Sequence, residues 1–151
     1  MVKIGYATTK ECTAIGYLEA QQTASGKYPF LFSQCQAIHA RSLLPCQDTP
    51  AIKATYDATV VSTLPILCSA QRVSPAQDEQ VPIDGKSRTY TFKQPVAIPS
   101  YLIAIAGGEL AFKSLGKRTG VWAEPTLLDA AAWEFEVSAR LHTDKQELPF
   151  C

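Results

Sequence analysis

The stretch Ser33–Ala54, SQCQAIHARSLLPCQDTPAIKA, decides how the rest of this chain is interpreted. Gln34 and Gln36 are two residues apart, so an extended backbone projects both side chains to the same side. Arg41 and Asp48 bracket a short apolar turn, and an arginine suits a carboxylate partner that it can contact twice. We therefore expect a structural ion pair that closes this turn. A substrate-binding role for the pair is the alternative.

The composition limits the classes of protein to which this chain can belong. The chain has 151 residues, which corresponds to one ordinary domain. Its 14 basic and 14 acidic residues give a formal net charge of +0, so neither nucleic acid nor an anionic membrane surface is predicted as a partner. The apolar run at residues 101–106 is far too short to cross a bilayer, and no apolar signal segment follows Met1. Five unevenly spaced cysteines predict reduced thiols in an intracellular, cytoplasmic protein.

Alternation of polar and apolar residues, interrupted by scattered prolines and glycines, predicts a mostly β protein. The clearest half-buried strand covers residues 52–62, where Ile52 and Tyr56 face one way and Lys53 and Asp57 face the other. Pro95 is expected to break the chain after a later strand. The other predicted strands are residues 2–7, 13–19, 65–71, 87–93 and 119–123, with an extended segment at 30–36.

The pattern changes after Pro125. Residues 126–141 are Ala-rich and amphipathic, and a proline at the first turn is typical of a helix start. Trp122 and Trp133 are expected to pack at the junction between the strands and this helix. Strands followed by one terminal helix indicate a β-sandwich with the beginning of a second unit attached. One helical face is expected to hold four apolar residues, Leu127, Leu128, Ala131 and Phe135.

Cys35, His39 and Cys46 are the residues that invite a metal or nucleophile interpretation. Their spacing, Cys-x3-His-x6-Cys, matches no common zinc pattern, so no metal site is predicted. A Cys35–His39 nucleophile pair is the rival hypothesis. Free cysteines are among the most buried residues, which favours packing cysteines and a histidine that stabilises the turn.

Several motifs in the chain resemble the N-terminal domain of gluzincin zinc aminopeptidases, nearest to the leukotriene A(4) hydrolase/aminopeptidase branch. The similarity extends over residues 2–141. The motifs that carry it are Gln-Cys-Gln-Ala at 34–37, Ala-Arg at 40–41, Pro-Cys-Gln-Asp-Thr-Pro at 45–50, Pro-Ser-Tyr-Leu-Ile-Ala at 99–104 and Val-Trp-Ala-Glu at 121–124. The motif at 99–104 resembles a strand of that family, so a strand is expected there.

The resemblance implies an incomplete, saddle-like β-sandwich with a C-terminal α-helix. Residues 1–124 would be a partial N-terminal β-sandwich domain, and residues 125–151 the first helix of a catalytic domain with an unmatched tail. The family's Gly-x-Met-Glu-Asn and His-Glu-x-x-His motifs do not occur in this sequence, and its two histidines, His39 and His142, are 103 residues apart (142 − 39). The resemblance therefore implies a truncated chain that is inactive alone, from a family that uses zinc.

The resemblance also implies a substrate-binding role for Gln34, Cys35, Gln36 and Ala37. In the related aminopeptidases the residue at the position of Gln36 reaches into the active-site cleft and accepts a hydrogen bond from the free amine of the peptide substrate. The implied partners are a peptide N-terminus and the catalytic domain of a parent chain, whose activities could include epoxide hydrolysis. Whether this chain is an enzyme is left open, and a stand-alone β-sandwich binding or interaction module is the alternative.

Overall fold

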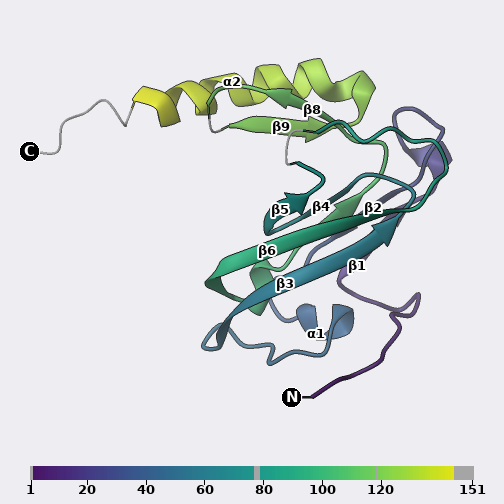
Figure 1. The fold of residues 1–151 in the computed structure, drawn as a ribbon, viewed down its shortest axis with the longest axis vertical. Helices are drawn as coiled ribbons and strands as arrows, with labels where there is room; N and C mark the ends of the chain where they lie inside the picture. The colour runs from purple at the N-terminus through teal and green to yellow at the C-terminus, as the bar shows by residue number, and fades with distance from the viewer. Residues whose placement is uncertain (1, 77–78, 118, 145–151) are drawn as a thin grey trace, which may run out of the picture.

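Figure 1 shows the fold in a computed structural model, which describes residues 2–76, 79–117 and 119–144. Strands dominate, and one long helix follows them at the C-terminal end. The expected fold class, mostly β with a C-terminal α-helix, is therefore confirmed. No helix among the described residues is long and apolar enough to cross a membrane.

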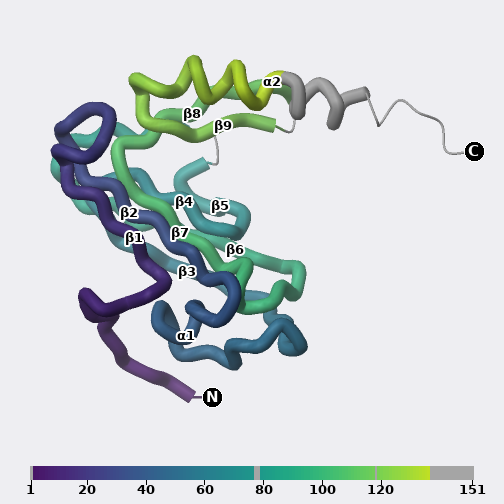
Figure 2. The backbone as a smooth tube through the Cα atoms, turned by 180° about the vertical axis from the view of Figure 1, so that it is seen from behind, coloured from purple at the N-terminus to yellow at the C-terminus, as the bar shows by residue number. Residues whose placement is uncertain are grey.

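The first sheet has four antiparallel strands in the spatial order β1–β2–β7–β4. Its short strands carry small and apolar residues on both faces, and Phe30 stacks near Phe32 with ring centroids 6.1 Å apart. Figure 2 shows this sheet in front of the second one. The strands are β1 (Ile15–Leu18), β2 (Phe30–Ser33), β7 (Ile105–Gly107) and β4 (Ile66–Cys68).

The second sheet has the antiparallel order β3–β6–β5, with β3 at Lys53–Ser62, β6 at Arg88–Pro99 and β5 at Gln71–Ser74. The strand predicted at residues 52–62 is confirmed. The predicted break at Pro95 is wrong, because β6 continues through it. The pairing register between β3 and β6 shifts at this point, and a proline without an amide hydrogen is tolerated at such an irregularity.

The two sheets meet at one side of the sandwich, where β4 leads into β5 through Ser69 and Ala70. The main core lies on this side and consists of Ile66, Val81, Tyr90 and Phe92. Half-buried side chains extend it along both sheets: Ala58, Val60, Cys68, Ala70 and Ile105. A second, smaller core lies near the loop after β2 and contains Ala14, Cys35 and Ala40.

A hairpin and a helix form the other end of the molecule. Strands β8 (Ala111–Ser114) and β9 (Gly120–Ala123) pair with each other, and α2 (Leu128–Asp144) packs against both after a short 3-10 turn at Pro125–Leu127. Figure 1 shows the helix lying along this hairpin. The predicted helix is thus confirmed, with its start two residues later than expected.

Aromatic packing at this end differs from the prediction at one tryptophan. Trp122 lies 5.1 Å from the ring of Phe112 and beneath the guanidinium of Arg72, so its expected packing role is confirmed. Trp133 is 72% exposed, so its expected packing role is wrong. The neighbouring Ala132 is buried instead, so the indole of Trp133 lies on the solvent side of the helix.

Two more local predictions are wrong. Residues 2–7 form no strand, because no described strand pairs with them, and they are exposed throughout. The motif at residues 99–104 is not a strand for most of its length. It ends β6 and forms a 3-10 turn at Ser100–Leu102, after which β7 begins at Ile105.

Candidate functional site

The four residues singled out by the sequence lie directly after β2. The strand ends at Ser33, and residues 36–39 turn into the short helix α1 (Ala40–Leu43). Gln34, Gln36 and Ala37 are exposed, whereas Cys35 is only 1% exposed. The Gln36–Ala37 peptide bond is cis. The extended segment predicted to reach residue 36 thus stops three residues earlier, and the loop presents three of the four residues to solvent.

Backbone hydrogen bonds fix the path of this loop on both sides of Cys35. The amide of Gln34 donates to the carbonyl of Ala14 at 2.7 Å. The amide of His39 donates to the carbonyl of Cys35 at 2.9 Å. The buried Cys35 side chain packs in the small core with Ala14 and Ala40. One main-chain bond therefore attaches the loop to the residue before β1, a second closes a turn within the loop, and the buried Cys35 side chain holds the loop in the small core.

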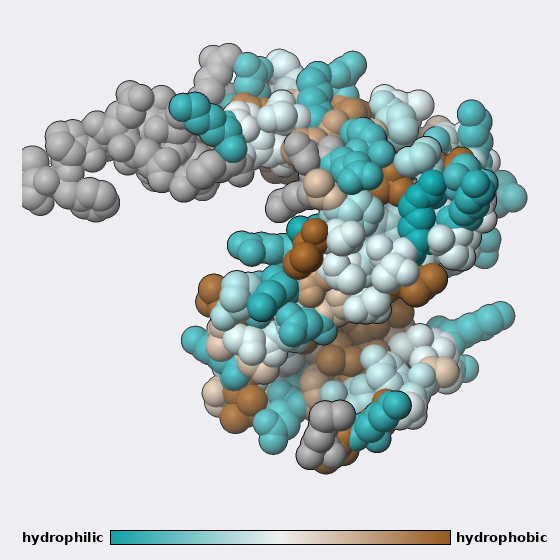
Figure 3. Space-filling model, in the orientation of Figure 1, coloured by the Kyte–Doolittle hydropathy of each residue, from teal (hydrophilic) through white to brown (hydrophobic). Residues whose placement is uncertain are grey.

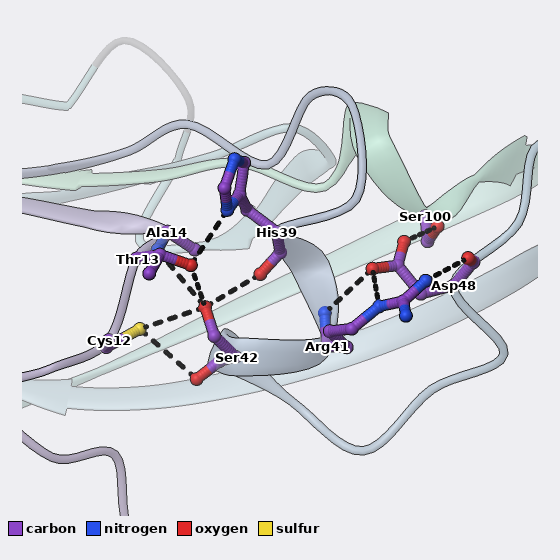
Figure 4. Close-up of polar contacts among 8 residues, drawn as sticks. All are labelled: Cys12, Thr13, Ala14, His39, Arg41, Ser42, Asp48 and Ser100. Carbon is purple, nitrogen blue, oxygen red and sulfur yellow. Dashed lines mark hydrogen bonds and ion pairs between the residues drawn. The ribbon is translucent and has the colours of Figure 1, made fainter.

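Ser42, in α1, is the centre of a network of polar contacts (Figure 4). Its hydroxyl donates to the carbonyl of His39 at 2.8 Å and accepts from the amide of Ala14 at 3.1 Å. Thr13 Oγ1 lies 3.2 Å from this hydroxyl and 2.8 Å from His39 Nδ1. The thiol of Cys12 donates to the carbonyl of Ser42 at 3.2 Å. This network connects the segment before β1 to the helix that follows the glutamine loop.

The cysteines near the loop are not arranged as nucleophiles. Burial, followed by the nearby Asp48 carboxylate, raises the pKa of the Cys35 thiol, and for the more exposed Cys46 partial desolvation by neighbouring groups, followed by Asp48, raises the pKa as well. Both groups are therefore held in the unreactive thiol form at neutral pH. The predicted packing role of Cys35 is confirmed, whereas Cys46 is exposed and belongs to neither core cluster. The His39 ring contacts Thr13 before β1, and its predicted role in stabilising the turn stays a prediction.

The predicted ion pair between Arg41 and Asp48 is confirmed and forms part of a larger contact. Arg41 donates to Asp48 Oδ2 from its backbone amide at 3.1 Å and from Nε at 3.0 Å. The Ser100 hydroxyl donates to Asp48 Oδ1 at 2.7 Å. The Ser100 hydrogen bond, and then the contacts from Arg41, lower the pKa of Asp48. The carboxylate thus joins the turn after α1 to the end of β6 (Figure 4).

Three residues of these polar contacts were not found by sequence reasoning. Thr13 and Ser42 belong to the network around Ser42, and Ser100 belongs to the contact around Asp48. Hydroxyl side chains are common on strands, caps and turns, so a single serine or threonine carries little signal. Ser100 lies within the motif at residues 99–104, but nothing in that motif indicates its partner 52 residues earlier.

The described residues contain no group of three or more His, Cys, Asp or Glu side chains that could hold a metal ion. The exposed loop instead offers neutral carboxamides. A glutamine carboxamide accepts hydrogen bonds through its oxygen and donates them through its nitrogen without adding charge. The chemistry available at this surface is therefore recognition of a polar or cationic group.

Comparison with known proteins gives this surface a family context. Residues 1–102 match the model of the peptidase M1 N-terminal domain. The chain is 48% identical over 135 residues to leucine aminopeptidase 2 of Coccidioides immitis, a match that covers 89% of this chain and 22% of the relative. It is 47% identical over 135 residues to leucine aminopeptidase 2 of Neurospora crassa, covering 89% of this chain and 20% of the relative.

Solved structures agree with the sequence comparison. Yeast LTA4 hydrolase in complex with bestatin superposes with a TM-score of 0.76 at 43% identity, over 88% of this chain and 19% of that one. Native leukotriene A4 hydrolase from Saccharomyces cerevisiae gives a TM-score of 0.72 at 44% identity, over 85% and 19%. The chain thus spans about a fifth of the length of the relatives it matches. By sequence and by fold, this chain belongs to the peptidase M1 N-terminal domain family, within the aminopeptidase and leukotriene A(4) hydrolase branch.

Proposed function

We propose that this chain is the substrate-facing N-terminal domain of a zinc metallo-aminopeptidase and forms one wall of its peptide-binding cleft. The observation that carries the proposal is the exposed loop with Gln34, Gln36 and Ala37, attached to the β-sandwich through the buried Cys35. Because the chain spans about a fifth of its relatives, hydrolysis is assigned to a longer parent enzyme.

In this proposal the carboxamide oxygen of Gln36 accepts a hydrogen bond from the free N-terminal ammonium of the peptide. A neutral acceptor suits this position, because it binds the cation without holding it as an ion pair would. Gln34 and Ala37 extend the same exposed surface, and Cys35 supports it from beneath. The network around Ser42 keeps the loop in place, so that little flexibility is lost when a peptide binds.

M1 peptidases are zinc metallopeptidases, and a bound zinc supplies the activated water for peptide hydrolysis. The described residues of this chain do not fit such a metal, because they contain no suitable cluster of ligands. No hydrolytic step is therefore assigned to them. The contribution proposed for this chain is binding and orientation of the peptide end.

We also propose the domain boundary between residues 124 and 125, with α2 as the first helix of the catalytic domain. The helix packs on the β8–β9 hairpin, and Lys113 Nζ lies 2.6 Å from Asp129 Oδ1 across this contact. In this proposal the hairpin is the part of the β-domain that contacts the first helix of the catalytic domain. A cytoplasmic location belongs to the same proposal.

A chimera tests the proposed function. The matching segment of the Saccharomyces cerevisiae enzyme is replaced by residues 2–141 of this chain, and release of the N-terminal residue from an aminoacyl amide is measured. We expect turnover within about tenfold of the unmodified enzyme. A chimera that folds and holds stoichiometric zinc but shows no turnover would contradict the proposal.

A further inference from the structure

His39 closes the turn that contains Gln36. The backbone amide of His39 donates to the carbonyl of Cys35 at 2.9 Å, so Gln36 is the second residue of a turn that spans residues 35–39. Cys35 is buried in the small core, which fixes the first end of this turn. The contacts of His39 fix the other end and therefore limit where the Gln36 side chain can lie.

Side-chain hydrogen bonds hold His39 at two points. Its ring Nδ1 lies 2.8 Å from Thr13 Oγ1, in the segment before β1. Its backbone carbonyl accepts from the Ser42 hydroxyl in α1, also at 2.8 Å. Thr13 Oγ1 and Ser42 Oγ are 3.2 Å apart, so the contacts of these three residues form a closed cycle (Figure 4).

The two segments that hold His39 are themselves packed. In α1, Ala40 is fully buried in the small core, and Ala14, next to Thr13, is buried in the same core. A hollow with a hydrophobic floor is visible in the lower half of Figure 3, at the position of α1 in Figure 1. Thr13 and Ser42 are thus attached to packed segments, and their hydroxyls hold His39 in place between these segments.

The number of hydroxyl hydrogens decides the direction of the bonds in the cycle. A serine or threonine hydroxyl has one hydrogen and two lone pairs. Ser42 donates its hydrogen to the His39 carbonyl, because a carbonyl oxygen can only accept. One lone pair of Ser42 Oγ accepts from the Ala14 amide, and the Cys12 thiol donates to the nearer Ser42 carbonyl rather than to this oxygen. The second lone pair is left for Thr13, which donates its only hydrogen there and can only accept from His39.

A proton on Nδ1 of the imidazole therefore makes every contact of the cycle a hydrogen bond. If Nδ1 were the acceptor, Thr13 would donate to it, and the oxygens of Thr13 and Ser42 would face each other at 3.2 Å without a hydrogen between them. The hydrogen bond of one ring nitrogen sets the tautomer of a neutral histidine. Neutral His39 then has its free lone pair on Nε2.

We propose that His39 is a positioning residue for Gln36 and that its neutral imidazole carries the proton on Nδ1. Nδ1–H donates to Thr13, Thr13 donates to Ser42, and Ser42 donates back to the His39 carbonyl. The positioning role rests on the proposed function of the glutamine loop. The cycle attaches the second end of the turn to α1 and to the segment before β1, so the Gln36 carboxamide is held ready for a peptide amine.

Nitrogen NMR of the full, isotope-labelled chain tests the position of the proton. At alkaline pH, where the imidazole is neutral, the protonated and the unprotonated ring nitrogen give separate signals. We expect the proton of His39 on Nδ1, and the variant His39→Asn assigns these signals by removing them and leaving those of His142. A proton on Nε2 overturns the proposal, because Thr13 would then donate to the ring.

Exchange of a donor for an acceptor at the same position tests the positioning role. The chimera with the Saccharomyces cerevisiae enzyme receives either His39→Asn, which keeps an N–H donor at the δ position, or His39→Asp, which has only acceptors there. The two side chains have the same shape and are equally suited to the residue before a helix, which His39 is. We expect His39→Asn to raise KM no more than about twofold, and His39→Asp to raise it about three- to tenfold with kcat unchanged.

The same two substitutions in a Gln36→Leu chimera separate this inference from the proposed function. There His39→Asp should have no further effect, because the residue that His39 positions has lost its carboxamide. If Gln36→Leu lowers kcat/KM but His39→Asp does not, the positioning role is overturned and the proposed function stands. An equal loss from His39→Asp with and without the Gln36 carboxamide also overturns it. If neither substitution lowers kcat/KM, the proposed function fails together with the positioning role. The NMR measurement on the full chain decides the proton position even if His39→Asp does not fold.

Discussion

Ser100 and Asp48, 52 residues apart in the sequence, are joined by a hydrogen bond of 2.7 Å from the serine hydroxyl to Oδ1. The Asp48 side chain is only 3% exposed, and its second oxygen accepts from Arg41. One carboxylate thus connects the turn after α1 to the end of β6. Because the glutamine loop precedes α1 directly, this contact helps to determine where Gln36 lies.

Asp48→Asn should lower the melting temperature at neutral pH, because the amide removes the charge that both partners stabilise. Glu134→Gln is the matched control, since it makes the same acid-to-amide change at an exposed position on α2. Circular dichroism during heating measures both variants. Equal melting temperatures for wild type and Asp48→Asn would mean that the carboxylate does not anchor the turn.

The effect of Asp48 should depend on pH in a defined direction. Its pKa is lowered in the folded chain, first by the Ser100 hydrogen bond and then by Arg41. A lowered folded pKa contributes stability above the unfolded value of about 4, and this stability is lost as the pH falls through the folded value. The difference in melting temperature between wild type and Asp48→Asn should therefore shrink below about pH 4. A difference that grows on acidification would contradict this assignment.

Tyr56 provides a test at the alkaline end. Its hydroxyl lies 2.9 Å from Ser69 Oγ and 3.4 Å from Cys68 Sγ. Burial, then the contact with Cys68, raises the pKa of Tyr56 to about 12. Tyr56→Phe should cost about 1 kcal/mol of unfolding free energy at neutral pH through the lost hydrogen bond. Urea unfolding measures this cost, with Tyr17→Phe as the exposed control.

The pH dependence of Tyr56 has the opposite sign to that of Asp48. Because the folded pKa lies above the unfolded value of about 10, its contribution is complete below pH 10 and is lost as the pH rises through about 12. Wild type should therefore lose more stability than Tyr56→Phe over that interval. An equal loss of stability in the two proteins over this pH interval would show that the pKa of the Tyr56 phenol is not raised by folding.

Two glycines allow a packing test by the same substitution. A Cβ at Gly108 would lie 2.6 Å from Phe30 Cδ2 and 3.3 Å from the carbonyl oxygen of Pro29, whereas a Cβ at Gly5 would meet nothing within 4 Å. Gly108→Ala should destabilise the fold by about 1–3 kcal/mol, because the Phe30 ring must move away and the Pro29 carbonyl must also give way slightly. Gly5→Ala should leave stability unchanged. Chemical unfolding of the two variants side by side decides this.

The sequence predicted a strand or helix correctly where its local residue pattern agrees with the tertiary contacts of that segment. The alternation at residues 52–62 matches β3, and the Ala-rich stretch after Pro125 matches α2. Where pairing with another strand determines the structure, the local pattern gave the wrong prediction. Residues 2–7 alternate as a strand should but have no strand partner among the described residues, and β6 continues through Pro95 because the register with β3 shifts there.

The substrate-binding role of the glutamine loop rests on a motif and stays a prediction, whereas the ion pair beside it followed from the residues themselves. The exposure of Gln34 and Gln36 agrees with a recognition role, and Arg41 does pair with Asp48. The burial of Cys35 and the contacts of Ser42 depend on segments that are distant in the sequence, which no local spacing encodes.

The isolated chain should show no zinc-dependent aminopeptidase activity. No group of metal-binding side chains occurs among the described residues, and catalytic zinc usually has three protein ligands. Metal analysis of the purified chain and release of N-terminal residues from an aminoacyl amide measure the two parts of this prediction. Stoichiometric zinc together with turnover would refute it.

Substitution of Gln36 tests the central claim, that this domain binds the peptide N-terminus, most directly. The variant Gln36→Leu is placed in the chimera with the Saccharomyces cerevisiae enzyme, and kcat/KM for a peptide with a free amine is measured beside Gln47→Leu, which makes the same change at an exposed position of the adjoining turn. A lost hydrogen bond to a charged amine costs about 1.5–3 kcal/mol, so kcat/KM should fall by about one to two powers of ten in Gln36→Leu. The Gln47→Leu variant should behave as the parent chimera. An unchanged kcat/KM in Gln36→Leu, with zinc content and fold intact, would contradict the account.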